Sequence, residues 1–164
     1  MNTTSNNQLH LIAEPNSHAI VGIREFDAPP ALVFRAFTEP ELLKQWLGPR
    51  RLETKVETFE VRDGGRWRFL HIDTDGTEYA FRGVFHGTPS VEGIIQTFEF
   101  EGAPGEVLLE RMTFEDLGGR TRIHGDSISL TVAGRDAMIE SGMESGMIEG
   151  YEKLDELLAR LINE

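Results

Sequence analysis

The sequence contains no cysteine, so disulfide bonds, thiolate nucleophiles and cysteine-ligated zinc are excluded. It also has little positive charge: 16 Lys and Arg residues stand against 28 Asp and Glu residues, which gives a net charge of −12. Because nucleic-acid phosphates bind to basic surfaces, this balance argues against a nucleic-acid partner. No apolar run approaches the roughly 20 residues that cross a bilayer, which argues against membrane insertion. The N-terminus has neither the basic nor the apolar region of a signal peptide, so a cytoplasmic protein is expected.

Catalytic and metal motifs are missing as well. The histidines His10, His18, His86 and His124 show no metal-ligand spacing, and there is no HExxH motif. The GxSxG motif of a serine nucleophile is absent. The sequence therefore predicts no metal site and no cofactor, and no residue is assigned a catalytic role from a motif.

The length of 164 residues suits one domain with a proper core. We expect residues 19–164 to form it, because no linker or internal repeat interrupts them. Residues 1–18 are expected to be a flexible N-terminal segment, with a possible extra edge strand over residues 9–13.

The first elements of this domain are expected to be one strand and two short helices. Residues 19–26 form a convincing strand, and Pro29-Pro30 ends it and starts a helix, since proline is tolerated at the first helical position. Pro40 starts a second helix that carries Trp46, and Gly48-Pro49 stops it.

The middle of the chain predicts strands separated by tight turns, with hairpin signals at Gly64-Gly65, Asp75-Gly76 and Gly118-Gly119. The predicted strands are 52–62, 66–73, 78–87, 94–101, 107–115 and 121–131. Apolar and polar residues alternate along several of them, which indicates one dry face and one charged face. This pattern is typical of an antiparallel sheet covered on one side by helix.

The C-terminal stretch from Arg135 to Ile162 predicts one long helix with glycines on its apolar face. Gly142, Gly146 and Gly150 fall at four-residue spacing, in one row with Met138. Each interior glycine should destabilise a helix by roughly 0.5–1 kcal/mol relative to alanine, so the row requires a reason. Either another backbone packs closely against it, or the helix leaves space beneath it for a ligand.

Several segments together resemble one known family, in its order and over nearly the whole chain beyond residue 18. They are VFRAFTEPELLKQWLGP (33–49), GGRWRF (64–69), DGTEYAFRGVF (75–85), QTFEFEGAPGEVLLERMTFED (96–116), GGRTRI (118–123) and SGMESGMIEGYEKLDELL (141–158). They resemble the START-like, or SRPBCC, superfamily, which has the helix-grip fold of the birch-pollen-allergen proteins and polyketide cyclases. Within it, the match is to the family related to the activator of the heat-shock-protein-90 ATPase.

The resemblance implies an α+β, helix-grip fold. A curved antiparallel sheet of six to seven strands would wrap around the long C-terminal helix, with two short helices after the first strand. Members of this superfamily bind apolar or aromatic small molecules in a cavity between that helix and the sheet. The family has no shared catalytic motif to carry over. Met147 stands where the family's usual tryptophan follows a glycine, here Gly146, which implies a softer pocket wall.

The candidate ligand-binding residues are the aromatic, thioether, glycine and polar positions that would face this cavity. They are Trp46, Trp67, Phe69, His71, Phe81, Phe85, Gln96, Phe98, Phe100, Glu110, Met112, Phe114, Met138, Gly142, Met143, Gly146, Met147 and Tyr151. Pocket walls consist of such residues with a few polar groups, but an ordinary hydrophobic core contains the same aromatic side chains.

Three polar residues among these apolar positions discriminate better. His71, Gln96 and Glu110 continue the alternation of apolar residues in their strands, which would place them in the interior with hydrogen-bond partners. A strand end that reaches solvent, or a bulge that reverses the alternation, would place them outside instead. In the interior, His71 and Glu110 could orient a ligand or act as acid and base.

Three functions remain open from the sequence. The first is non-enzymatic binding of a small hydrophobic or aromatic molecule, such as a lipid or polyketide. The second is a cyclase- or hydrolase-type enzyme that uses the same cavity. The third is a co-chaperone-like module that binds a heat-shock ATPase. A homodimer formed through a sheet edge is also possible.

Overall fold

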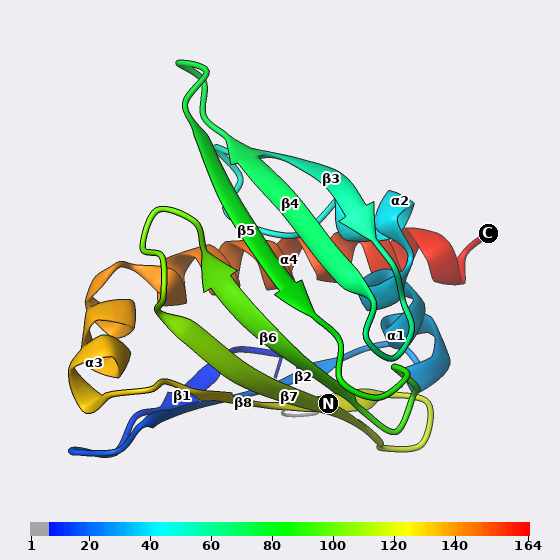
Figure 1. Ribbon diagram of the computed structural model, residues 1–164. Helices are drawn as coiled ribbons and strands as arrows, with labels where there is room; N and C mark the ends of the chain where they lie inside the picture. Colours follow the sequence, from blue (N-terminus) through cyan, green and yellow to red (C-terminus); the bar gives the residue numbers. More distant parts are fainter. Residues whose placement is uncertain (1–6) are drawn as a thin grey trace.

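The computed structural model describes residues 7–164, so residues 1–6 of the N-terminal segment predicted to be flexible lie outside the described residues. Twelve elements follow one another along the chain (Figure 1). They are β1 (His10–Ile12), β2 (Ala19–Phe26), α1 (Pro30–Thr38), α2 (Pro40–Leu43), β3 (Glu53–Phe59), β4 (Arg66–Ile72), β5 (Glu78–Val84), β6 (Ile94–Phe100), β7 (Val107–Asp116), β8 (Thr121–Ile128), α3 (Val132–Glu140) and α4 (Met143–Ile162).

The strands form one antiparallel sheet in the order β1-β2-β8-β7-β6-β5-β4-β3. The predicted α+β helix-grip architecture is confirmed, with eight strands rather than six to seven because residues 10–12 add β1 at one edge. The two short helices follow β2 as expected, although α2 ends at Leu43 and Trp46 lies in the turn beyond it. In the part of the chain that the structure describes, no helix is long and apolar enough to cross a membrane.

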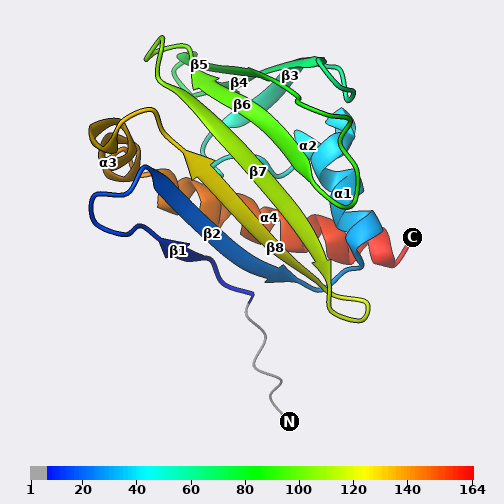
Figure 2. The ribbon, with the colours of Figure 1, turned by 60° about the horizontal axis from the view of Figure 1, so that its bottom comes forward.

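Helix α4 crosses one face of the sheet, with α3 beyond its N-terminal end and α1 and α2 near its C-terminal end (Figures 1 and 2). Its buried residues are Gly150, Tyr151, Leu154, Leu157 and Leu158, which pack into the core against the inner face of the sheet. Their spacing of three and four residues places them on one side of the helix. The core is therefore concentrated under the part of α4 from Gly150 to Leu158.

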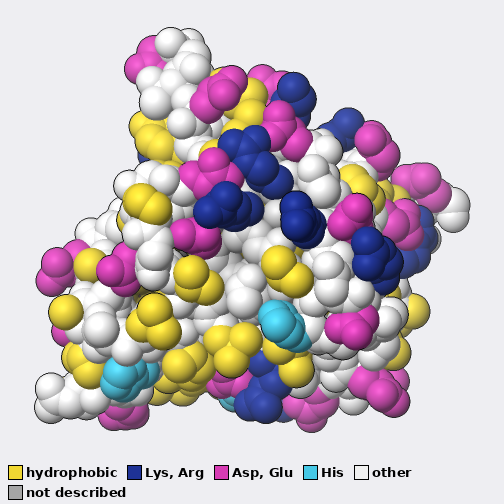
Figure 3. Space-filling view, viewed as in Figure 1, with side chains coloured by type: hydrophobic (Ala, Val, Ile, Leu, Met, Phe, Trp, Pro, Cys, Tyr) yellow, Lys and Arg dark blue, Asp and Glu magenta, His cyan; other side chains and the backbone are white. Residues whose placement is uncertain are grey.

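The outer face of the sheet, which Figure 3 shows, is charged with apolar side chains among the charges. Ion pairs such as Arg82–Glu99 and Arg111–Asp126 cross neighbouring strands on it. Leu109 is 50% exposed and belongs to the same face. The two faces differ as the alternation predicts, so the apolar side faces α4.

The prediction of one helix over residues 135–162 is wrong. Helix α3 ends at Glu140, and α4 begins at Met143 after a break at Gly142, whose φ of +87° lies in the left-handed region. Glycine adopts this conformation without steric penalty and commonly terminates helices for that reason. Met138 and Gly142 are therefore not part of one row with Gly146, because they lie outside α4.

The two glycines inside α4 have different surroundings. A Cβ atom at Gly150 would lie 3.1 Å from the carbonyl oxygen of Trp46 and 3.3 Å from the amide nitrogen of Gly48, so another stretch of backbone packs directly against it. A Cβ atom at Gly146 would meet only Cδ of Pro49, at an ordinary 3.6 Å. Close packing thus explains Gly150, whereas the helix surface at Gly146 has room.

This difference predicts opposite effects of alanine at the two positions. Gly146→Ala should stabilise the protein by roughly 0.5–1 kcal/mol, because it removes backbone freedom from a helix interior without a clash. Gly150→Ala should destabilise it by about 1–3 kcal/mol, because the atoms it would meet belong to backbone and do not rotate away. Urea unfolding of the two variants measures both changes. Equal stability of the two variants would contradict the close contact at Gly150.

Candidate binding site

A row of polar residues crosses the inner face of the sheet. Gln96 of β6 lies opposite Glu110 of β7, which lies opposite Ser127 of β8. Phe85 lies opposite Gln96 at the other end of the row and is only 2% exposed. Because residues opposite each other in an antiparallel sheet point to the same side, the whole row faces α4. The alternation that would place Gln96 and Glu110 in the interior therefore holds.

Glu110 is the centre of this row. Its Oε1 accepts a hydrogen bond from Nε2 of Gln96 at 3.0 Å, and its Oε2 accepts one from Oγ of Ser127 at 2.9 Å. Burial raises the pKa of the Glu110 carboxyl, and the two hydrogen bonds partly offset that effect. Each oxygen of Glu110 retains a further lone pair, so the carboxyl can accept another hydrogen bond from a ligand.

Tyr151 of α4 brings a second polar group to the same region. Its side chain is 7% exposed, and burial together with the negative charge of Glu110 raises the pKa of the Tyr151 hydroxyl to about 12. The hydroxyl is therefore protonated at neutral pH. It forms no hydrogen bond with any residue in the range 7–164, which leaves it available for a ligand.

Next to the polar row, the inner face of the sheet carries a glycine, Gly125, that the sequence analysis did not single out. Gly125 follows Ile123 and precedes Ser127 on the inward-facing positions of β8. A Cβ atom built on Gly125 would meet only the carbonyl oxygens of Gly22 and Arg111, at 3.8 and 3.9 Å. Among the described residues, no side-chain atom lies within 4 Å of that position. In the sequence, the spacing of two residues between Gly125 and Ser127 was the available sign that both face the interior.

Aromatic and thioether side chains surround the polar row. Phe81 and Phe98 have ring centroids 5.6 Å apart, and Phe81 and Phe100 are stacked at 5.0 Å. Met112 of β7 and Met147 of α4 pack against the same core. All five residues are only half-buried although they belong to the inner, apolar side of the molecule.

The predicted ligand-binding residues thus divide into groups. Trp46, Trp67, Phe69, His71, Phe85, Phe114 and Tyr151 are buried, and all of them except His71 belong to the hydrophobic core cluster. Phe81, Gln96, Phe98, Phe100, Glu110, Met112, Met138, Met143, Gly146 and Met147 are half-buried, and Gly142 is exposed. The half-buried members of β5, β6, β7 and α4 are those that a ligand could contact without displacing the core.

His71 is buried at a different place. Oγ1 of Thr54 donates to the carbonyl oxygen of Leu47 at 2.8 Å, so Nδ1 of His71 donates to Thr54 Oγ1 across 3.0 Å. The opposite edge of the ring packs on Gly48, where a Cβ atom would lie 2.7 Å from Nε2. Burial, and next the charge of Lys153, lower the pKa of His71 to about 4. The imidazole is therefore neutral and fixed by its neighbours.

His71 and Glu110 do not form an acid–base pair. The ring contacts of His71 are with Phe69 and Phe81, at centroid distances of 5.0 and 5.3 Å. The hydrogen bonds of Glu110 are with Gln96 and Ser127, and no described contact joins Glu110 to His71. The arrangement therefore does not favour catalysis by this pair.

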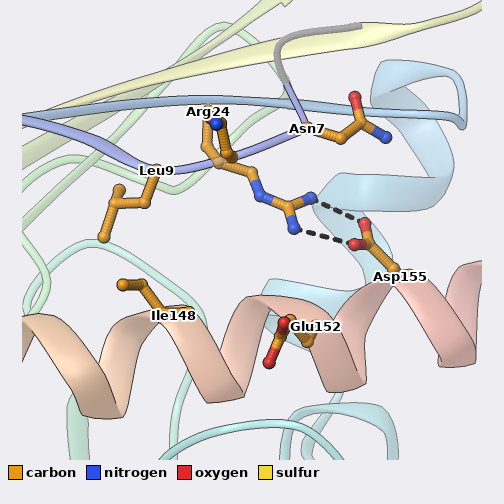
Figure 4. A pocket seen from close by; sticks show the side chains of 7 residues that line it. Asn7, Leu9, Arg24, Ile148, Glu152 and Asp155 are labelled. Carbon is orange, nitrogen blue, oxygen red and sulfur yellow. Dashed lines mark hydrogen bonds and ion pairs between the residues drawn. The ribbon is translucent and has the colours of Figure 1, made fainter.

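Two pockets open on either side of α4. One has a volume of about 330 Å³ and is lined by Asn7, Gln8, Leu9, Arg24, Ile148, Glu152 and Asp155 (Figure 4). The other has a volume of about 500 Å³ and is lined by Pro40, Glu41, Lys44, Gln45, Leu52, Glu53, Thr54, Lys55, Val56 and Lys153. Neither is lined by any of the predicted ligand-binding residues.

A family model described as "Activator of Hsp90 ATPase homolog 1-like protein" matches residues 27–159, which is most of the chain. The protein belongs to this family. The match covers the polar row, the half-buried aromatic residues and nearly all of α4, so the candidate site lies within the family's domain. A search of curated proteins found no match.

Solved structures support the assignment of this activator-like fold. A solution structure of a protein from Arthrobacter aurescens is 26% identical, with 92% of this chain and 91% of that chain covered and a TM-score of 0.84. A crystal structure of a protein from Rhodobacter sphaeroides is 25% identical, with 93% and 99% covered and a TM-score of 0.85. A Mycobacterium smegmatis protein, Ms6760, is 19% identical over 91% and 95% of the chains with a TM-score of 0.82, which shows the fold alone.

Proposed function

We propose that this protein binds a small hydrophobic or aromatic molecule between α4 and the inner face of the sheet, without catalysis. The observation that carries the proposal is the carboxyl of Glu110, held by Gln96 and Ser127 in a polar row that half-buried apolar side chains surround. Ligand sites combine apolar walls with a few placed polar groups, and this surface has that composition.

The polar groups indicate how the ligand would be oriented. The carboxyl of Glu110 accepts hydrogen bonds, and the Tyr151 hydroxyl, which has no partner among the described residues, both donates and accepts. A molecule with a hydroxyl or amine beside an aromatic or aliphatic body matches this arrangement. Its body would lie against Phe81, Phe98 and Met147, and the space above Gly125 would admit it.

The test is a binding titration with a panel of lipids, flavonoids and polyketides. Native mass spectrometry detects the complex, and tryptophan fluorescence follows the titration because Trp67 lies 5.7 Å from Phe98, ring centroid to ring centroid. For a binder found in the panel, Glu110→Gln should weaken affinity roughly tenfold, since it replaces an accepting oxygen with an amide donor, and an unmade hydrogen bond in a buried site costs about 1–3 kcal/mol. Glu115→Gln is the control, because it removes the same charge from the same strand at an exposed position.

A second variant tests the space rather than the polar group. Gly125→Val adds a side chain suited to a strand at a position where a Cβ atom meets only backbone oxygens at ordinary contact distance, so it should block the ligand while the protein remains folded. Affinity unchanged in both variants would exclude this surface as the site. A folded protein that binds no member of the panel would contradict the proposed function.

A further inference from the structure

Every lysine of the protein lines the pocket of about 500 Å³. The sequence contains only three lysines among its 16 basic residues, and they are Lys44, Lys55 and Lys153. All three line this one pocket, although they come from the end of α2, from β3 and from α4. We call it the lysine pocket. The protein has a net charge of −12, so three lysines in one pocket form a local concentration of positive charge.

Two of the three ammonium groups form no ion pair among the described residues. Lys44 pairs with Glu41 at 2.7 Å, whereas Lys55 and Lys153 form no ion pair with any residue between 7 and 164. Glu41 and Glu53 also line the pocket, so three positive charges meet two negative ones. The lining therefore has an excess of positive charge, and the carboxylate of Glu41 is already engaged by Lys44.

The carboxylates around Lys153 are engaged as well. Glu156 forms an ion pair with Arg50, and Glu149 accepts a hydrogen bond from the backbone nitrogen of Arg50 at 2.9 Å. Lys153 is half-buried on α4, and burial, followed by the charge of Arg50, lowers its pKa, although the charges of Glu149 and Glu156 partly oppose this. A half-buried ammonium without a partner is stabilised by an anion that enters the pocket.

The pocket follows the free edge of the sheet. Its lining includes five consecutive residues, 52–56, whose side chains point alternately to the two faces, so the pocket runs along the strand and not over one face. Strand β3 is last in the sheet order, which leaves the backbone N–H groups on one of its sides without a strand partner. These N–H groups add hydrogen-bond donors next to the lysines, while the hydroxyl of Thr54 is already bonded to Leu47 and His71.

We propose that the lysine pocket binds the oxyanion group of a small molecule, a phosphate or a carboxylate. Ammonium and backbone N–H groups are donors that such oxygens accept. Leu52 and Val56 supply apolar wall for the organic part of the ligand. A volume of about 500 Å³ lies within the range of small-molecule sites, which favours a small ligand over a peptide added to the edge strand. The inference does not rest on the proposed function, because no residue of the candidate binding site lines this pocket.

The test is a titration of ¹⁵N-labelled protein followed by NMR, with sodium pyrophosphate, sodium octanoate and sodium chloride at matched ionic strength. Either oxyanion should give saturable shifts confined to residues 40–45, 52–56 and 153, and chloride should not. A response to pyrophosphate alone assigns a phosphate ligand, and a response to octanoate alone assigns a carboxylate with an apolar tail. Shifts that do not saturate, or that chloride reproduces, would overturn the proposal.

Variants that remove one positive charge distinguish binding at the lysine pocket from a general effect of the protein's net charge. Lys153→Gln should weaken the saturable binding roughly tenfold, which corresponds to about 1.4 kcal/mol. Lys55→Gln should act in the same direction and serves as the second variant if Lys153→Gln unfolds. Arg66→Gln is the matched control, because it removes one positive charge from the neighbouring strand β4, outside the pocket. Equal loss in Arg66→Gln, or no loss in either lysine variant, would overturn the site.

Discussion

Replacing Asp155 by alanine is expected to destabilise the protein by about 3 kcal/mol. Nη1 and Nη2 of Arg24 contact Oδ1 and Oδ2 of Asp155 at 2.6 and 2.7 Å, in the parallel geometry that Figure 4 shows. Arg24 is only 3% exposed, so removing Asp155 leaves a buried guanidinium without its counter-ion. The expected value is at the lower end for a broken buried pair, because the side chain of Asp155 is 36% exposed and water can partly replace it.

The surroundings of Arg24 explain why it would not simply move to solvent. Its guanidinium carbon lies 4.5 Å from the ring centroid of Phe26 and 5.9 Å from that of Tyr151. The double variant Arg24→Met with Asp155→Ala removes both charges and keeps apolar volume, so it should recover most of the loss. Urea unfolding of the two single variants and the double variant gives the coupling free energy.

The exposed ion pair Arg35–Glu39 is the control for the variants of Arg24 and Asp155. Its side chains are 52% and 48% exposed, so Glu39→Ala should change the free energy of unfolding by less than about 1 kcal/mol. A cost below about 1 kcal/mol for Asp155→Ala as well would show that the Arg24 pair behaves like a surface pair.

Acidification should destabilise the protein through His71 by about 3 kcal/mol in total. The native pKa of about 4 lies below the ordinary value of 6.5, because burial and the charge of Lys153 disfavour the imidazolium. Between these two pH values the unfolded chain binds a proton that the native state does not bind, so the free energy of unfolding falls as the pH falls. Each unit of difference in pKa corresponds to about 1.36 kcal/mol.

A histidine variant isolates this contribution from the other titrating groups. His71→Asn keeps a donor near the position of Nδ1 for the bond to Thr54 and removes the titration, so the dependence on pH between about 4 and 6.5 should become weaker. The exposed His86 changed to asparagine is the control and should leave the dependence as it is. Glu110 acts in the opposite direction, because its pKa is raised, so the native state holds a proton at pH values where the unfolded chain has lost it. An unaltered pH dependence in His71→Asn would mean that other groups cause the acid sensitivity.

The sheet and the inward direction of its polar residues could be predicted because strands have a period of two. Alternation alone indicated that Gln96 and Glu110 share the apolar face, and the register places them opposite each other. The hairpin signal at Gly118-Gly119 predicts that β8 lies beside β7, and the alternation in β8 puts Gly125 and Ser127 on the same face as Ile123. The contact between Glu110 and Ser127 depends on the exact register of this hairpin, which alternation alone does not give.

The glycines near α4 show what a spacing pattern does not predict. A spacing of four is the same whether a glycine lies inside a helix or ends one, so the pattern could not distinguish Gly142 from Gly146. The lysine pocket could not be predicted at all, because Lys44, Lys55 and Lys153 are separated along the chain and meet only where the end of α2, the edge strand and α4 come together.

The contact between Gly150 and the turn at Trp46–Gly48 has a consequence for the width of the interior. At this point the main chain of the turn lies between α4 and the sheet, since Gly48 touches Gly150 on one side and the ring of His71 on the other. The distance from helix to sheet is therefore set here by the thickness of one peptide segment and not by the size of any side chain. Substitutions along the inner face would therefore change the shape and polarity of the interior while leaving this gap the same.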